Sequence, residues 1–499
     1  MKKLLALFGF GLLLVSCSND DNGGITPPDG PEDIEYTSGS ADFSNFVAVG
    51  NSLTAGYSDA ALFIDGQTAS YPNMMASNFA LAGGGAFNIP FMADNLGGAT
   101  LGGQSLFGNR YILDFSTGDP APVPIEGTGT TEITNKLSGT FNNMGVPGAK
   151  SYHLIAPGYG NIAGIAVGLA NPYYARFASS DNATIIGDAA VQNPSFFSLW
   201  IGHIDILNYA TSGGVGIDQT GNLDPSTYGS NDITDPMVFA GVYNGLLQTL
   251  TENGADGVVA NILDINSLPY FTTVPYNPVP LDEATAALLN GAYAAYNGGV
   301  AQIAALNVIT PEEAAARVIS FQAGDANPVV IIDEDLTDLT GFNPALINMR
   351  QATPEDLLVF TSQTIIGTLA NPNDPTSING VAVPLADKWV LTPQEQQLVS
   401  NAVATFNQTI EALAQQYNLA FVDAQELMNS ITDTGIPLSD GSTVTATYAT
   451  GGAYSLDGVH PSPRGYALLA NLFLEVINEK YGSNMPGVNP LDYTGLYIK

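Results

Sequence analysis

Cysteine and basic residues are the scarcest features of this chain. Its 499 residues include one cysteine, and 12 lysines and arginines stand against 47 aspartates and glutamates, which gives a formal net charge of −35. A single cysteine has no partner with which to form a disulfide within the chain. A body this acidic repels nucleic acid and anionic lipid head groups, so we expect no nucleic-acid partner.

Charged residues of both signs are sparse as well. They make up 12% of the chain, whereas hydrophobic residues make up 45% and there are 54 glycines. This composition is typical of a folded, loop-rich exported protein and excludes a disordered one. Length alone would suggest about three domains of roughly 150 residues each, but the arrangement of the motifs below argues for one.

The first hydrophobic run is too short to cross a bilayer, which takes about 20 residues. It covers Leu4–Val15, with Lys2–Lys3 before it, proportions that are typical of a signal peptide. The sequence Leu-Val-Ser-Cys at 14–17 resembles a bacterial lipobox, which implies lipidation of Cys17 after cleavage. The alternative is a signal peptide with an incidental cysteine. We therefore predict a lipoprotein signal peptide at residues 1–17.

A flexible tether is predicted for residues 18–42, which are rich in Gly, Pro, Asp, Ser and Thr without periodicity. Its first residues, Ser18–Asp21, are similar to the acidic surface-export signals of Bacteroidetes lipoproteins. Because the acidic body gives no electrostatic attachment, the acyl chains must supply the anchor. We expect a lipid-anchored protein of the bacterial cell envelope, at the outer membrane or the cell surface.

An acid and an imidazole lie three residues apart near the C-terminus, at Asp457 and His460. An apolar helix is predicted directly after them, with Ser462 as its N-cap and Pro463 in its first turn. This helix holds the preceding loop in a defined place. Asp457 can therefore fix the tautomer of His460, as the third group does in a nucleophile–base–orienter relay.

A candidate nucleophile lies at the other end of the chain. The apolar run Phe46–Gly50 is followed by Asn51 and Ser52 in a turn of small residues. A short buried strand delivers a hydroxyl in this way to the C-terminal edge of a parallel sheet, where sites of α/β proteins form. The glycines do not have the spacing of the G-x-S-x-G elbow.

Together the two stretches resemble the SGNH or GDSL-type hydrolases, whose first block reads Gly-Asp-Ser-Leu and whose last reads Asp-x-x-His. Here the first block is Gly50–Leu53, with Asn51 in place of the aspartate. The resemblance implies that Ser52 is the nucleophile, His460 the base and Asp457 the group that orients it. It implies no metal and no organic cofactor. The alternative is a turn serine, with a capping acid beside a structural histidine.

Two middle blocks of the family supply the groups that bind the oxyanion. Gly148, within Phe141–Lys150, stands where a loop glycine donates its backbone N–H together with that of Ser52. Taken alone, this stretch is better explained as an ordinary turn, and its place between the other two blocks favours the functional interpretation. His153, just beyond it, is expected to be a packed histidine without a catalytic role.

The third block departs from the family pattern. It reads Gly202–Asp205, and Ile204 occupies the place of the asparagine that donates a side-chain N–H. His203 is adjacent, but neighbours in an extended strand point to opposite faces, so it is not an automatic substitute. A local bulge could still turn its imidazole toward the oxyanion.

The remaining pattern predicts a flavodoxin-like, three-layer α/β/α sandwich with a parallel sheet. Strand and helix signals alternate at 195–201, 235–254, 257–262, 392–417 and 419–422. Because the catalytic blocks lie at both ends, we predict one hydrolase domain at 43–482, with insertions near 58–140 and 269–391 and a tail at 483–499. The acidic run Asp333–Asp335 lacks the glycine and spacing of an EF-hand and is expected to be a solvated loop.

These observations predict a serine-dependent hydrolase of carboxylic esters that acts through an acyl-enzyme. Its substrate would be a small-molecule, lipid or acylated-glycan ester. Because Ile204 cannot donate, one alternative is a catalytically weakened relative that binds an acylated ligand. A second is a surface lipoprotein that binds a glycan or a partner through its insertions.

Overall fold

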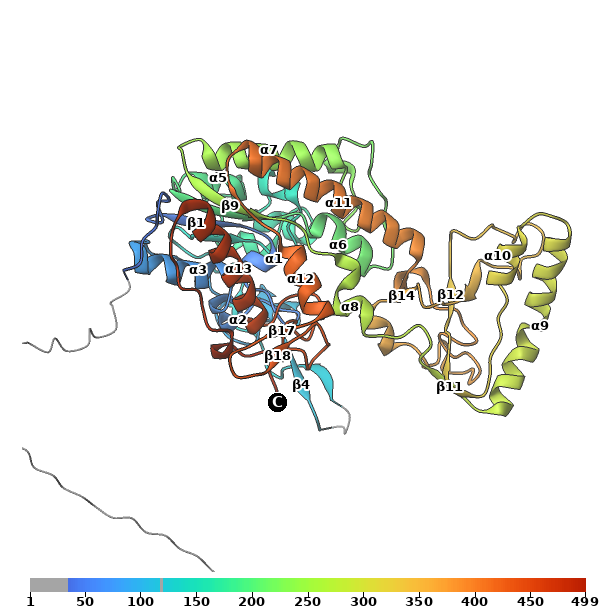
Figure 1. Ribbon diagram of the computed structural model, residues 1–499. Helices are drawn as coiled ribbons and strands as arrows, with labels where there is room; N and C mark the ends of the chain where they lie inside the picture. Colours follow the sequence, from blue (N-terminus) through green and yellow to red (C-terminus); the bar gives the residue numbers. More distant parts are fainter. Residues whose placement is uncertain (1–34, 117–119) are drawn as a thin grey trace, which may run out of the picture. The chain divides into compact units, whose positions relative to one another are not determined.

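A five-stranded parallel sheet lies at the centre of the structure (Figure 1). This computed structural model describes residues 35–116 and 120–499. In chain order the strands are β1 (Phe46–Gly50), β7 (Asn143–Gly145), β8 (Phe196–Trp200), β9 (Asp256–Ala260) and β16 (Ala420–Val422). Every residue of β1 and β8 is buried. Such continuously buried runs are expected for parallel strands that are covered on both faces.

The spatial order of the sheet is β16-β9-β8-β1-β7, and each pair of neighbours is parallel. Numbered along the chain, this is the 2-1-3-4-5 order of doubly wound, flavodoxin-like sheets. The predicted fold class is therefore confirmed. The strand order reverses between β1 and β8, and a crevice forms at the carboxyl ends of the strands at such a point.

The register places the ends of β1 and β8 side by side, because Gly50 pairs with Trp200. A Cβ atom on Gly50 would lie 2.2 Å from Oγ1 of Thr54 and 2.4 Å from the carbonyl oxygen of Trp200, so only glycine fits there. Ser52 and His203 consequently leave the sheet at the same edge.

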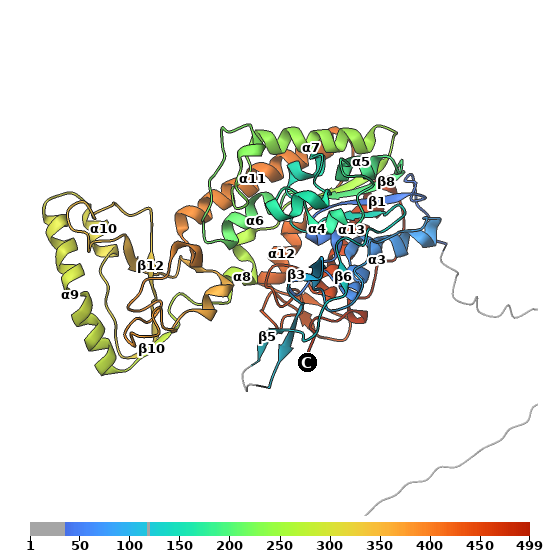
Figure 2. The same ribbon diagram turned by 180° about the vertical axis from the view of Figure 1, so that it is seen from behind.

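Helices cover both faces of the sheet (Figures 1 and 2). On one face α13 (Pro463–Tyr481) packs against α3 (Tyr71–Phe79), and on the other α11 (Pro393–Gln416) and α5 (Ile185–Ala190) pack against α7 (Pro236–Thr251). The N-caps follow the sequence-based prediction. Ser462 accepts the N–H of Gly465, and Asp235 accepts those of Met237 and Val238. The helix predicted to reach residue 254 ends at Thr251.

Short elements connect these layers. They are α1 (Ser52–Ala55), α2 (Ile64–Thr68), β2 (Ala99–Leu101), β3 (Gln104–Phe107), β4 (Tyr111–Asp114), β5 (Ala121–Pro124), β6 (Thr131–Glu132), α4 (Pro172–Ala175), α6 (Ile204–Thr211), α12 (Ala424–Asp433), β17 (Ile436–Pro437) and β18 (Thr443–Val444). The last residues of the chain run beside β4, where the N–H of Leu113 donates to the carbonyl of Tyr497 at 2.9 Å.

A second hydrophobic cluster is built from residues 274–390, within the segment expected to be an insertion. Its elements are β10 (Val279–Leu281), α9 (Glu283–Ala305), α10 (Pro311–Ala316), β11 (Gly324–Asn327), β12 (Val330–Ile332), β13 (Met349–Gln351), β14 (Leu357–Leu358) and β15 (Val390–Leu391). The short helix α8 (Pro269–Thr272) precedes them, and its Phe271 packs in the core of the sheet. This segment therefore has a core of its own beside that of the sheet.

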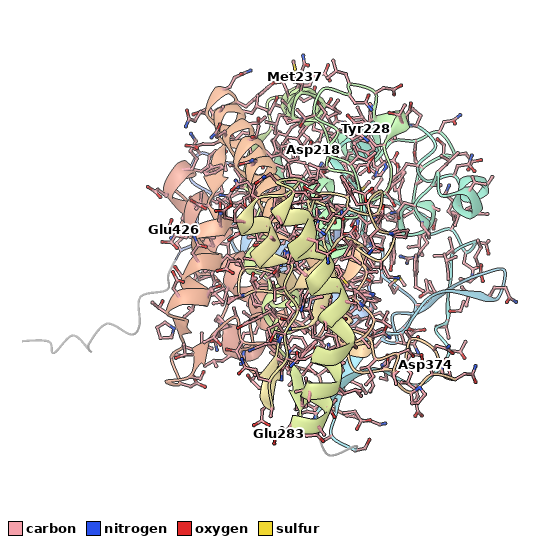
Figure 3. All side chains as sticks on the ribbon, turned by 90° about the vertical axis from the view of Figure 1, so that its right-hand side faces the viewer. Asp218, Tyr228, Met237, Glu283, Asp374 and Glu426 are labelled. Carbon is pink, nitrogen blue, oxygen red and sulfur yellow. The ribbon has the colours of Figure 1, made fainter. Side chains whose placement is uncertain are left out.

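The acidic side chains lie mainly at the surface. Figure 3 shows Asp218, Glu283, Asp374 and Glu426 at the outside of the ribbon, and all four are exposed. Across the part of the chain that is described, no helix has both the length and the apolar character needed to span a membrane. The predicted signal peptide with Cys17, and most of the predicted tether, lie outside the described residues.

Candidate active site

The structure brings together Ser52, His460 and Asp457, three residues from opposite ends of the chain. Nε2 of His460 lies 2.8 Å from Oγ of Ser52, although the two residues are 408 positions apart. Nδ1 of His460 lies 2.9 Å from Oδ2 of Asp457. A hydroxyl, an imidazole and a carboxylate therefore form one continuous line of hydrogen bonds, the geometry of a nucleophile with its base and orienter.

Ser52 is presented by the tight turn between β1 and α1. Asn51 is the N-cap of α1, and its Oδ1 accepts the N–H of Leu53 at 3.1 Å. Asparagine thus keeps the oxygen that the aspartate of the family would offer. Its Nδ2 is buried without a hydrogen-bond partner among the residues described. Gly56 ends the helix in the left-handed region, with φ at +81°.

Asp457 is held ionised by its surroundings. Its Oδ1 accepts the backbone N–H groups of Val459 at 2.9 Å and His460 at 2.8 Å, and its Oδ2 accepts that of Ala60 at 3.0 Å. Burial raises the pKa of Asp457, but the charge of His460 and these hydrogen bonds outweigh it and lower the pKa to about 2. The carboxylate therefore draws the ring proton to Nδ1 and leaves Nε2 free to accept from Ser52.

Ala60 is a positioning residue that the sequence did not reveal. Asp59 and Ala60 have φ of 51° and 63°, a left-handed conformation that is costly for both. Ser58 and Ala61 close the turn with two backbone hydrogen bonds, of 3.1 and 3.0 Å. The turn directs the N–H of Ala60 at Asp457. Only Ser58 and Asp59 mark it in the sequence, and without a glycine or asparagine the signal for a left-handed turn was weak.

The side chain of Asp59 ties the same turn to the catalytic loop. Its Oδ1 accepts the N–H of Leu456 at 2.9 Å, and its own N–H donates to Oγ of Ser455 at 2.9 Å. Burial raises the pKa of Asp59 to about 7, against the effect of the hydrogen bond from Leu456. The beginning of the predicted first insertion is thus joined directly to the loop that carries His460.

An open pocket of about 360 Å³ lies in front of the triad. Its walls are Ser52, Tyr57, Phe107, Pro147, Gly148, Asn171, Pro172, Tyr173, Ile204 and His460. Gly148 therefore faces the same space as Ser52, as the family resemblance implies. The rings of Phe107 and Tyr173 are stacked at 4.8 Å, and that of Tyr57 lies 4.7 Å from His460.

The loop that carries Gly148 is fastened from both sides. Nδ2 of Asn171 donates to the carbonyl of Pro147 at 2.8 Å. Asp205 accepts the N–H and the hydroxyl of Ser151 at 2.8 and 2.7 Å. Gly148 has φ of +80°, and glycine adopts this without strain. The loop around Gly148 is therefore fixed by hydrogen bonds to its neighbours Pro147 and Ser151.

His203 is the N-cap of α6 and Ile204 its first residue, so neither lies in an extended strand. The backbone of His203 is helical, with φ of −59° and ψ of −48°, because β8 has already ended at Trp200. The argument that strand neighbours point to opposite faces therefore does not apply. Both side chains line a second, small pocket beside Ser52. Ile204 lines the open pocket as well.

The ring of His203 is buried, and its edge packs against Trp200 at 5.2 Å between centroids. Burial, and then the charge of His460, lowers the pKa of His203 to about 3, so the ring is neutral. Its Nε2 accepts the N–H of Leu263 at 3.4 Å, which places the proton on Nδ1. Nδ1 has no hydrogen-bond partner in the described part of the chain.

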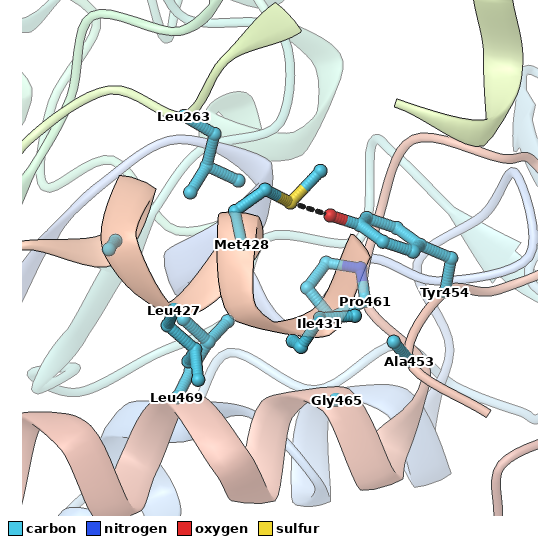
Figure 4. A pocket seen from close by; sticks show the side chains of 10 residues that line it. Leu263, Leu427, Met428, Ile431, Ala453, Tyr454, Pro461, Gly465 and Leu469 are labelled. Carbon is cyan, nitrogen blue, oxygen red and sulfur yellow. Dashed lines mark hydrogen bonds between the residues drawn. The ribbon is translucent and has the colours of Figure 1, made fainter. Parts of the chain in front are cut away.

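The small pocket is almost entirely apolar. Ser52, His203 and His460 share it with Leu53, Ile204, Leu207, Leu263, Ile265, Leu268 and Val459. Its volume of about 20 Å³ has room for one water-sized group. Behind the catalytic loop lies another apolar pocket, which contains no catalytic side chain (Figure 4). There the hydroxyl of Tyr454 points at the sulfur of Met428, and Pro461, next to His460, forms part of the wall.

His153 has a packing position, as expected from the sequence. Its Nδ1 accepts the N–H of Lys150 at 3.1 Å, and its ring stacks on Tyr159 at 4.3 Å. No residue of the triad contributes to the one group of acidic side chains, among those described, that could hold a metal ion. That group is Glu334, Asp387 and Glu395.

Residues 329–473 match the model of the GDSL-like lipase/acylhydrolase family. The matched range contains Asp457 and His460 and does not contain Ser52 or Gly148. It begins inside the segment expected to be the second insertion. The match covers 145 of the 499 residues (473 − 329 + 1 = 145).

Comparison with solved structures finds a mutant of an acetyl-xylooligosaccharide esterase from Geobacillus Stearmophilus. The alignment covers 88% of this chain and 95% of that chain at 10% sequence identity, with a TM-score of 0.31. A TM-score this low carries no argument, so the assignment of the fold rests on the sheet described above. No curated protein matches the chain.

Proposed function

We propose that this protein is a serine-dependent hydrolase of carboxylic esters of the SGNH or GDSL type. The observation that carries the proposal is the line of hydrogen bonds from Ser52 through His460 to Asp457. The family match supports it independently, because the matched range includes the Asp-x-x-His block. It supports ester hydrolysis as the class of reaction, and the identity of the nucleophile rests on the geometry.

In the proposed mechanism Oγ of Ser52 attacks the ester carbonyl while Nε2 of His460 takes its proton. Asp457 stabilises the imidazolium and keeps the ring in place. The tetrahedral intermediate collapses as His460 gives the proton to the departing alcohol, which leaves an acyl group on Ser52. A water molecule then attacks the acyl-enzyme, with His460 as base, and releases the carboxylic acid.

The backbone N–H groups of Ser52 and Gly148 would stabilise the oxyanion. Ile204 adds no donor. His203 is a side chain near Ser52 with an unpaired N–H, because its ring is neutral and its Nδ1 has no partner among the described residues. The alternative in which His203 replaces the missing asparagine therefore gains a specific atom.

The two pockets suggest how an ester would bind. The small pocket admits a short acyl group, such as acetyl, because it has room for one water-sized group among apolar side chains. The open pocket, with the rings of Tyr57, Phe107 and Tyr173, would take the alcohol part of the ester. Flat aromatic walls of this kind suit a small aryl or sugar alcohol better than a long lipid chain.

The test is hydrolysis of p-nitrophenyl acetate by the purified protein and by Ser52→Ala. We expect the substitution to remove nearly all activity without loss of folding, as monitored by circular dichroism. Ser77→Ala is the matched control, since this exposed hydroxyl only bonds to the carbonyl of Asn73 on α3. Equal activity of wild type and Ser52→Ala would refute the nucleophile. No activity in any variant would favour the weakened, ligand-binding alternative.

We also propose that the protein is anchored to the cell envelope by lipid on Cys17. The support is the lipobox-like sequence and the acidic body, since the residues concerned are outside the described part of the chain. Cys17→Ser should move the protein from the membrane fraction to the soluble fraction. Retention of this variant in washed membranes would refute a lipid anchor.

A further inference from the structure

Three carboxylates from separate parts of the chain converge far from the triad in sequence. Glu334 follows β12, Asp387 begins the 3₁₀ turn Asp387–Trp389, and Glu395 lies in the first turn of α11. One carboxylate oxygen of each lies within 4.8 Å of those of the other two. The acidic loop predicted to be merely solvated therefore contributes Glu334 to a cluster.

The protein supplies no positive charge to this cluster. Over residues 35–116 and 120–499, none of the three carboxylates has an ion pair with a lysine, arginine or histidine. The nearby Arg350 is committed to Asp333 at 2.5 Å and Asp356 at 2.6 Å. The ammonium of Lys388 lies over the ring of Trp389, at 4.8 Å from its centre.

Two of the carboxylates also carry oxygens without hydrogen-bond donors. Glu395 is only 3% exposed, and its Oε2 accepts the N–H and the hydroxyl of Thr392 at 2.7 and 2.9 Å. Its Oε1 is buried and has no partner in the structure as described, and neither has Oδ1 of Asp387. Buried oxygens of this kind are normally satisfied, so the cluster is incomplete as the protein alone presents it.

The chain leaves room for this arrangement on the side of α6. Gly213 and Gly214 follow α6 with φ of +65° and +81°. A Cβ atom on Gly214 would lie 1.5 Å from Oε1 of Glu395, and one on Gly213 would lie 2.5 Å from the carbonyl oxygen of Asp387. A side chain at position 214 would displace the free oxygen of Glu395, and one at position 213 would displace the backbone that carries Asp387.

We propose that Glu334, Asp387 and Glu395 bind a calcium ion. Calcium takes six to eight oxygen ligands at roughly 2.3–2.6 Å, so oxygens on opposite sides of one ion lie about 4.8 Å apart. The three ligand atoms lie within that span of one another, so one ion could bind all three. Calcium accepts an irregular shell of protein oxygens, whereas magnesium demands near-ideal octahedral geometry and usually keeps several waters. Water and backbone carbonyls would complete the shell. The ion would tie the loop after β12 to the start of α11.

The electrostatics agree with this assignment. Burial, together with the neighbouring Glu334, raises the pKa of both Asp387 and Glu395 above the ordinary values of these residues. This is the behaviour of carboxylates that face one another without a cation. A bound divalent ion would lower both pKa values. The competing explanation for the close approach of the three carboxylates is a proton shared among them.

The test uses the full-length protein after treatment with EDTA and dialysis. Isothermal titration with calcium chloride should show binding, and calcium should raise the melting temperature by a few degrees, because it binds only the folded state. The double variant Glu334→Gln, Asp387→Asn should bind at least about tenfold more weakly. Glu283→Gln, an exposed acid on α9, is the matched control and should bind as wild type does.

Three outcomes would overturn the proposal. They are no heat and no change in melting temperature at millimolar calcium, equal affinity in the wild type and the double variant, and an equal response to magnesium. If the double variant does not fold, the calcium affinity of Glu334→Gln is compared with that of the wild type instead. Glu334 is exposed, so this substitution should not disturb folding. The measurement is repeated in Ser52→Ala, where the calcium response must persist, so that the ester-hydrolase proposal and the calcium proposal fail independently.

Discussion

The catalytic carboxylate and the acidic cluster use the same chemical group in opposite surroundings. Asp457 receives three backbone N–H groups and faces an imidazole, and its pKa is lowered to about 2. Glu334, Asp387 and Glu395 face one another, and the pKa of two of them is raised. The first site is complete within the protein, whereas the second requires something from solution.

This difference shows what each site can be expected to do. A carboxylate whose charge is already balanced can orient a base without help, so the triad needs only a substrate. Carboxylates without a counter-charge remain costly until a proton or a cation arrives. Substitutions that neutralise one carboxylate should therefore have opposite effects on stability at the two sites, while only the triad should control activity.

The largest effect is expected from breaking the complete site. His460→Ala removes the base, and we expect kcat/KM on p-nitrophenyl acetate to fall by on the order of 10⁶-fold. Asp457→Asn keeps the shape but favours the wrong tautomer, so a smaller loss, on the order of 10⁴-fold, is expected. Steady-state kinetics on variants with unchanged circular dichroism measure both. Equal activities of His460→Ala and wild type would show that His460 is not the catalytic base.

A smaller effect is expected at the third block. If Nδ1 of His203 donates to the oxyanion, His203→Ala should lower kcat by about 10²–10³-fold with little change in KM, because the donor acts on the developing charge. Ile204→Asn should then gain little. If His203 only packs against Trp200, Ile204→Asn should raise kcat instead. Indifference of an active enzyme to both substitutions would mean that the missing donor lies elsewhere in the chain.

The two sites also differ in how much of each could be predicted from the sequence. The strand before Ser52, the helix after His460 and the helix expected at 392–417 all depend on local patterns, and the structure confirms each of them. Their local signals agree with the global fold. The parallel order of the sheet followed from alternating strands and helices in the same way.

Contacts between distant segments gave no such signal. The N–H of Ala60 is directed at Asp457 by a left-handed turn that contains no glycine. Glu334 lies close to Asp387 and Glu395 only in the folded chain. His203 was assigned to an extended strand, because an apolar run does not show where a strand ends and a helix begins. Tertiary packing, rather than periodicity, decided these positions.

Acyl-chain length gives an effect of intermediate size. The small pocket holds one water-sized group, so p-nitrophenyl hexanoate should react at least about tenfold more slowly than the acetate, judged by kcat/KM. Leu207→Ala removes part of the pocket wall, so kcat/KM for the hexanoate should come closer to that for the acetate. Leu288→Ala, at an exposed position on α9, should leave the ratio of the two unchanged. A wild type that prefers the hexanoate would show that the acyl group binds in the open pocket.

The smallest effects are expected in stability, and they test the comparison directly. The folded-state pKa of Asp457, about 2, lies below the ordinary value near 3.9 for an unfolded chain. Its charge therefore stabilises the fold above about pH 4, and this contribution of about 2–3 kcal/mol is lost as the pH falls from 4 to 2. Asp457→Asn should lower the free energy of unfolding at pH 7 by about that amount, and its difference from wild type should shrink on acidification.

Asp387→Asn should do the reverse near pH 9 when EDTA is present, because the raised pKa values of Asp387, about 7, and Glu395, about 8, leave the cluster ionised only above that range. Removing one of three uncompensated charges should raise the free energy of unfolding, by about 1 kcal/mol once solvent screening is allowed for. With saturating calcium the sign should change, because the variant has lost a ligand and gains less from the ion. Urea denaturation of wild type and variant, with EDTA and with calcium, measures all four values. If Asp387→Asn destabilises the protein equally in both conditions, the carboxylate is already satisfied within the protein, and the contrast between the two sites does not exist.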